Sequence, residues 1–261
     1  MSAKTRCSLS KEMELSYYKT NAVYDLLSKE QKHPFVWVSG NAWMLIYGDQ
    51  MVTPKVLVLA FGKSWTKQKE IIKTMEIIAA RSEIPLFFVK FDDEAESIEK
   101  VLFGSPGQQP AELTLDELKN EFQKIGLPVE NGTCGKSVND ATSSAYHKWQ
   151  RDNLGSIIKV TDIDLVRLDS DGEPIEVIEL KRSFYSFDQW NPYSKDYVNF
   201  NLLLSVCKPA AMTVTIAYNV RQTEPFFKDD ASQLLLFSYS TQNTPVKIGK
   251  FSYNDFLAGS Y

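Results

Sequence analysis

The chain has 261 residues, of which 43% are hydrophobic and 24% charged, and its formal net charge is −4. This length and apolar content suit one large or two modest globular domains, and they exclude a disordered or low-complexity protein. The acidic balance argues against a protein coated in basic surface, although an uneven charge distribution can leave a basic cleft on an acidic body. No apolar stretch has the length of a membrane span.

Hydrophobic periodicity predicts alternating helices and strands in the first hundred residues. The predicted order is helix, three strands, helix, strand and a short helix, at 10–32, 35–38, 42–47, 55–61, 65–81, 85–91 and 98–102. The segment 104–110, Gly-Ser-Pro-Gly-Gln-Gln-Pro, is typical of a linker, and Thr114 with Glu117 forms a capping box for a helix that ends at Gly126. We therefore expect an N-terminal α/β domain at 1–104, a linker and helix at 105–137, and a second domain at 138–261.

The second domain is predicted to begin with a helix that leads into a hairpin. Asn139 or Asp140 can cap this helix, and Gly155 would end it. Two β-branched arms at 157–182 flank the turn signal Asp169-Ser170-Asp171-Gly172. The remaining predicted elements are a helix and three strands, at 195–207, 212–220, 233–239 and 246–253.

Charged residues stand inside both arms of this hairpin. Strand side chains share a face at every second residue, so Asp162 and Asp164 share one face of the first arm, and Glu179 and Lys181 share one face of the second. A buried carboxylate is costly unless it pairs, binds a cation or does chemistry. Oxygen ligands favour a hard ion such as Mg²⁺ or Mn²⁺, and a nearby lysine can stabilise charge on a phosphate. The pattern predicts a phosphodiester-cleaving site.

Asp164 followed by Glu179-Leu180-Lys181 resembles the active-site motif of the PD-(D/E)XK nuclease superfamily. The order helix, strand, strand, helix, strand over about 138–220 also resembles that family's core, with its first strand short or hidden near Ser156. The proline of the family name is absent. We favour Asp164 as the metal ligand because strand formers flank it, and Asp162 is the alternative in another register.

The resemblance implies a restriction-endonuclease-like mixed sheet flanked by helices. It implies that Asp164, Glu179 and the backbone carbonyl of Leu180 hold one or two Mg²⁺ (or Mn²⁺) ions while Lys181 orients the attacking water. It also implies a metal-dependent endonuclease in restriction, repair or mobile-element defence, commonly a homodimer. We expect DNA rather than RNA as the substrate. The rival hypothesis is a non-catalytic nucleic-acid or protein-binding module that retains the fold.

Further residues are candidates for the same site. Some branches of the superfamily use a histidine on the helix before the hairpin as a Mn²⁺ ligand, which would be His147 here, and Gln150 is a second candidate on that helix. Tyr197 and Asn201 share a face of the next helix and are candidate substrate contacts. Basic residues near the motif are candidate phosphate contacts, with Lys159 and Arg182 foremost; the others are Lys148, Arg151 and Arg167.

The N-terminal half leaves three roles open. Its element order also resembles the nuclease core, but its strand ending Ala60-Phe61-Gly62-Lys63 has no acid, so a degenerate duplicate is one hypothesis. Substrate recognition and dimerisation are the others. Three cysteines far apart and an N-terminus without an apolar segment lead us to expect a cytoplasmic protein.

Overall fold

The computed structural model describes residues 21–95, 97–130, 132, 145–222, 228–240 and 244–261. Within these ranges the N-terminal half contains three helices and six strands, namely α2 (Ala22–Leu27), β1 (Phe35–Val36), β2 (Ala42–Gly48), β3 (Pro54–Gly62), α3 (Lys69–Ser82), β4 (Leu86–Phe91), β5 (Lys100–Gly104), β6 (Ala111–Thr114) and α4 (Leu115–Lys124). The C-terminal half contains α5 (Ala145–Asn153), β7 (Lys159–Asp162), β8 (Leu165–Leu168), β9 (Pro174–Ser183), a 3-10 turn η1 (Ser194–Asp196), α6 (Tyr197–Cys207), β10 (Thr213–Gln222), β11 (Lys228–Ser238), β12 (Val246–Ser252) and α7 (Tyr253–Ala258).

The two halves repeat one order of elements: helix, three strands, helix, three strands, helix. The strands form two six-stranded mixed sheets. The N-terminal sheet has the order β7-β2-β3-β4-β5-β6, and the C-terminal sheet has the order β1-β8-β9-β10-β11-β12. Strands β3 and β4 are parallel, as are β9 and β10, and all other neighbours are antiparallel. The two halves therefore share one topology, and the chain is a mixed α/β protein.

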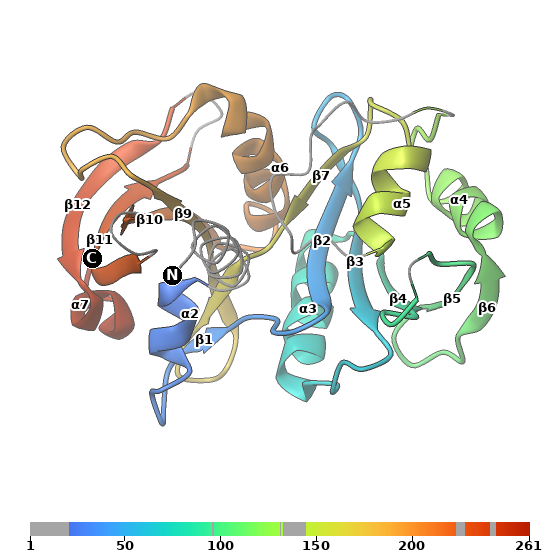
Figure 1. Cartoon of the computed structure of the whole chain (residues 1–261), viewed down its shortest axis with the longest axis horizontal. Helices are drawn as coiled ribbons and strands as arrows, with labels where there is room; N and C mark the ends of the chain where they lie inside the picture. The colour runs from blue at the N-terminus through green and yellow to red at the C-terminus, as the bar shows by residue number, and fades with distance from the viewer. Residues whose placement is uncertain (1–20, 96, 131, 133–144, 223–227, 241–243) are drawn as a thin grey trace, which may run out of the picture.

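Each half contributes its first described helix and first described strand to the sheet of the other half. Strand β1 pairs with β8 of the other half, with Val36 opposite Val166, and β7 pairs with β2, with Asp162 opposite Leu45. Figure 1 shows the blue α2 and β1 beside the C-terminal sheet and the yellow-green α5 and β7 beside the blue β2. The expected division at 104 and 138 does not separate the two sheets, because each half supplies elements of the other.

Helices α3 and α6 lie between the two sheets, and the other helices cover the outer faces (Figure 1). One hydrophobic cluster joins both sheets through these helices, and it includes Met75 of α3 and Leu203 of α6. Helix α6 is apolar on nearly all sides, as a helix buried on all sides must be. Helix α2 packs on the outer face of the C-terminal sheet, and α5 packs on that of the N-terminal sheet.

Two sequence predictions in the N-terminal half are wrong. The segment predicted as a short helix at 98–102 is not helical: from Lys100 it forms strand β5, in which buried and exposed residues alternate and which pairs with β4. The expected linker at 104–110 is the loop of the β5–β6 hairpin, in which Phe103 lies opposite Ala111. Glycine and proline signal a turn equally well within a sheet and between domains. None of the helices in the described ranges is long and apolar enough to cross a membrane.

Candidate functional site

Asp164 lies where the chain passes from one sheet to the other. The Ile163 N–H still donates to Met44 O of the N-terminal sheet at 2.8 Å, whereas Leu165 already pairs with Ile178 of β9. At this crossing the Asp164 side chain takes the place of a strand carbonyl as hydrogen-bond acceptor, because its Oδ2 accepts the Leu180 N–H at 2.8 Å. In an extended strand the N–H and C=O of one residue point to the same side. The Leu180 carbonyl therefore faces the Asp164 side of β9.

Glu179 and Lys181 lie on the face of β9 that is turned toward α6. Glu179 is only 4% exposed. Its Oε1 lies 2.7 Å from the Lys181 Nζ, and its Oε2 is buried with no hydrogen-bond partner among the described residues. The Lys181 ammonium lies over the Phe200 ring of α6, 5.8 Å from its centroid. The site thus holds a buried carboxylate oxygen that is short of a donor or a cation.

A second buried glutamate in the same strand shows what full satisfaction looks like. Glu176, 2% exposed, faces the opposite side of β9. Its Oε2 accepts from Arg167 Nε at 2.6 Å and from the Tyr261 hydroxyl at 2.7 Å, and its Oε1 accepts from the Thr215 hydroxyl. Buried polar groups are normally satisfied in this way. Glu176 is therefore satisfied where Glu179 is not, and the neighbouring strand β10 holds another buried oxygen without a partner among the described residues, Asn219 Oδ1.

Burial raises the pKa of Glu179 and raises the pKa of Asp164 well above its usual range. Neighbouring carboxylates, including Asp162, add to both shifts, and Lys181 partly opposes them. Burial alone would lower the pKa of Lys181, but Glu179 and Asp164 outweigh it and the net shift is upward. The cluster is short of positive charge, a condition that a bound cation relieves.

We expect the stability of the metal-free protein to fall as the pH rises from about 4 through the raised pKa values of Asp164 and Glu179, because the folded state then binds more protons than the unfolded state. Urea unfolding in EDTA over this pH range measures the effect. An Asp164→Asn variant should flatten the profile. A wild-type profile that rises with pH in this window, or one that Asp164→Asn leaves unchanged, would contradict the assigned shifts.

Two residues near the acids had no place in the sequence prediction. The Tyr24 hydroxyl of α2 donates to the Asp164 carbonyl at 2.9 Å, and Asp196, just before α6, raises the pKa of both Glu179 and Lys181. Tyr24 was missed because the exchange brings α2, not α5, to the helix position next to this hairpin. The repeated order of elements in the two halves was the one sequence signal that could have pointed to this exchange.

The two candidates on α5 pack on the N-terminal sheet. The His147 ring packs edge-on to Trp43 with centroids 4.5 Å apart, and Gln150 Oε1 accepts from the Tyr47 hydroxyl at 2.5 Å. The exchange therefore takes α5 away from the hairpin's own sheet, but His147 and Gln150 line the same cavity as Asp162, the alternative metal ligand.

The remaining candidates have protein partners or lie elsewhere. Asn201 Oδ1 accepts from the Tyr239 hydroxyl at 2.5 Å, and the Tyr197 ring packs with Phe200 at 6.1 Å. Arg182 forms an ion pair with Asp229 at 2.7 Å. Lys159 lines a cavity beside β7.

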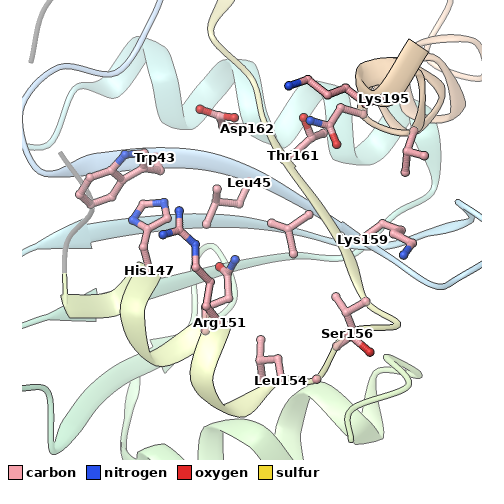
Figure 2. Close-up of a pocket in the computed structure, with 16 residues that line it drawn as sticks. Trp43, Leu45, His147, Arg151, Leu154, Ser156, Lys159, Thr161, Asp162 and Lys195 are labelled. Atoms are coloured by element: carbon pink, nitrogen blue, oxygen red, sulfur yellow. The ribbon is translucent and has the colours of Figure 1, made fainter. Parts of the chain in front are cut away.

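This cavity has a volume of about 430 Å³. It lies beside α5, β7 and the start of α6, and Asp162 lines it as well. Figure 2 shows His147 and Arg151 rising from α5, with Lys195 approaching from the α6 side. Since Asp162 acts electrostatically on both Asp164 and Glu179, the cavity borders the acidic cluster.

Within the described parts of the chain, no three His, Cys, Asp or Glu side chains are placed to hold a metal ion together. Magnesium needs less than this, since it usually keeps several waters and binds one or two carboxylates plus substrate phosphates. Asp164, the open oxygen of Glu179 and the Leu180 carbonyl form an oxygen-only donor set. Their chemistry fits such an ion.

Comparisons with known proteins add little to this geometry. No family model matches the sequence, and no curated protein matches it. Among solved structures, the chain is compared with the C-terminal domain of the sex pheromone staph-cAM373 precursor from Staphylococcus aureus, at 9% sequence identity and a TM-score of 0.14, covering 80% of this chain and 70% of that one. A TM-score this low carries no argument about fold or function.

Proposed function

We propose that the protein is a metal-dependent endonuclease of the PD-(D/E)XK superfamily, with a restriction-endonuclease-like core built on the C-terminal sheet, and that it acts on DNA rather than RNA. The observation that carries the proposal is the buried Glu179 oxygen, which has no partner among the described residues and lies beside Lys181 and Asp164. The order helix, three strands, helix and parallel strand supports it, once α2 and β1 are counted with this sheet.

Asp164, Glu179 and the Leu180 carbonyl would hold the metal ion, which when bound supplies a Lewis acid for the phosphate oxygens. Lys181 stays protonated at neutral pH because its pKa is raised. It is therefore suited to donate a hydrogen bond, and so to orient water or stabilise negative charge, and unsuited to remove a proton. Tyr24 fixes the Asp164 backbone through its carbonyl and so acts as a positioning residue.

We propose that the N-terminal unit binds the nucleic-acid substrate and does not cleave it. Its corresponding strand β3 ends in Phe61 and Gly62, and Lys63 then follows; this segment has no acid. Lys63 forms an ion pair with Asp92 at 2.5 Å. The Gly62 N–H donates to the backbone carbonyl of Asn41 at 2.7 Å. At the corresponding position of β9, the Leu180 N–H donates to the side chain of Asp164 instead. A duplicate that has lost its acids fits these contacts.

The rival is a binding module in which the Glu179–Lys181 pair is only structural, and that ion pair is the observation in its favour. Purified protein incubated with plasmid, linear duplex, single-stranded DNA and RNA separates the two. We expect cleavage with Mg²⁺ or Mn²⁺, none with EDTA, and none by Asp164→Asn. The matched control is Asp171→Asn, an exposed aspartate in the turn of the same hairpin, which should cut normally. Binding without metal-dependent cleavage on any substrate would favour the module.

A further inference from the structure

The cavity beside β7 has the size of a ligand site, since about 430 Å³ lies within the range typical of small-molecule pockets, roughly 300–1,000 Å³. Strand β7 is the terminal strand of the N-terminal sheet among the described strands. One wall of the cavity is α5, and the start of α6 forms another. The cavity therefore lies where the N-terminal sheet meets the acidic cluster of the C-terminal sheet.

The lining of this cavity is cationic in an acidic protein. Arg151, Lys159 and Lys195 line it, and none of the three forms an ion pair with an acid of the described chain. The one carboxylate in the lining is Asp162, at the end of β7 that leads to Asp164. With a formal net charge of −4 for the whole chain, three cations around one cavity, without ion-pair partners among the described residues, create a local field that attracts anions.

Two polar atoms of the lining are buried without partners among the described residues. These are Arg151 Nη1, a donor, and Thr161 Oγ1, a hydroxyl on a side chain that is 3% exposed. Buried donors are normally satisfied. A guanidinium and a hydroxyl together match the oxygens of a phosphate. Trp43 adds an aromatic wall against which a base can stack.

We propose that this cavity binds a phosphate group of a nucleotide, and that its source is the substrate strand, which runs from Glu179 and Lys181 past β7 onto the N-terminal unit. This inference rests on the proposed function and adds a strand path to it. Arg151 and Thr161 contact the phosphate, and Lys159 and Lys195 neutralise it.

Fluorescence anisotropy with a labelled single-stranded oligonucleotide, in EDTA so that no cleavage intervenes, tests the cavity. The variants are Arg151→Gln and Lys195→Gln. The matched control is Lys73→Gln, which removes the same charge from an exposed lysine of α3 that does not line the cavity. Each cavity variant should weaken binding by about tenfold and lower the salt dependence of log K by about one unit, as loss of one phosphate contact does. Lys73→Gln should change affinity less than about twofold.

Competition with deoxynucleoside monophosphate and with inorganic phosphate identifies the source. If only the unlabelled oligonucleotide competes, the bound phosphate belongs to a strand, as proposed. If the mononucleotide binds saturably and this binding depends on Arg151, the phosphate site is supported but its ligand is a free nucleotide, which contradicts the proposed strand path. Equal loss in the Lys73 control overturns the inference, as does unchanged binding by both cavity variants. If binding depends on Arg151 but the wild type cuts nothing, the proposed nuclease fails and the cavity stands. If Asp164→Asn abolishes cleavage while Arg151→Gln binds the oligonucleotide normally, the proposed nuclease is supported and the proposed phosphate site fails.

Discussion

Glu179→Gln is expected to abolish cleavage and to leave the protein folded. Glu176→Gln is expected to lower the stability of the protein and to leave cleavage by the folded protein normal. The two side chains belong to one strand, are almost equally buried, and differ in their partners. At position 179 the glutamine carbonyl still accepts from Lys181, so the free energy of unfolding should change by no more than about 1 kcal/mol. Loss of the charge that holds the metal should lower the rate by roughly a thousandfold.

At position 176 the same substitution removes the negative charge that Arg167 faces at 2.6 Å. It also places an amide NH₂ among groups that are already donors, the hydroxyls of Thr215 and Tyr261. Breaking a buried, hydrogen-bonded ion pair costs about 3–5 kcal/mol, somewhat less where one partner is partly exposed, as Arg167 is here. We therefore expect a loss of roughly 2–4 kcal/mol in stability, with normal cleavage below the unfolding transition.

Urea unfolding in EDTA and cleavage rates in Mg²⁺, measured on both variants, make the comparison. Equal loss of activity in the two variants at full folding would show that Glu179 has no special role. A large loss of stability in Glu179→Gln alone would show that its pair with Lys181 is structural, as the rival hypothesis requires.

The hairpin and its charges were readable from the sequence because they depend on local rules. The β-branched arms and the Asp169–Gly172 turn specify the hairpin, and Leu165 indeed pairs with Ile178 across it. Alternation along β9 put Glu179 and Lys181 on one face, and the structure joins them at 2.7 Å. The structure also places Asp164, not Asp162, against Leu180.

The exchange between the halves was not readable, because nothing local decides it. Strand β1 has two paired residues and β7 has four, and the two sheets offer the same topology to either strand. Which sheet each strand joins depends on packing far along the chain, such as Phe35 stacking on Phe256. The packing of α5 could not be predicted for the same reason, because the exchange places His147 and Gln150 on the N-terminal sheet and not on the sheet of the hairpin that follows them.

Expressed alone, residues 138–261 are expected to remain unfolded, because α2 and β1 complete their sheet. These elements contribute four side chains that are at most 3% exposed, Val23, Leu27, Phe35 and Val36. Burial of each large apolar side chain contributes about 1.5–3 kcal/mol, so their removal costs roughly 6–12 kcal/mol. This sum is comparable with the total stability of a typical domain, about 5–15 kcal/mol. Residues 1–137 lose α5 and β7 in the same way.

Mixing the two fragments should restore a cooperative unfolding transition, followed by circular dichroism and size-exclusion chromatography. Within the intact chain, Phe35→Ala should lower the free energy of unfolding by about 3–5 kcal/mol, although Phe35 lies more than a hundred residues before the other strands of its sheet. Met51→Ala, at a side chain that is 77% exposed, is the control and should change little. A fragment 138–261 that folds alone would mean that α5 and β7 can dock on their own sheet. The exchanged arrangement would then be one of two near-equal packings, and Tyr24 would lose its assigned place beside Asp164.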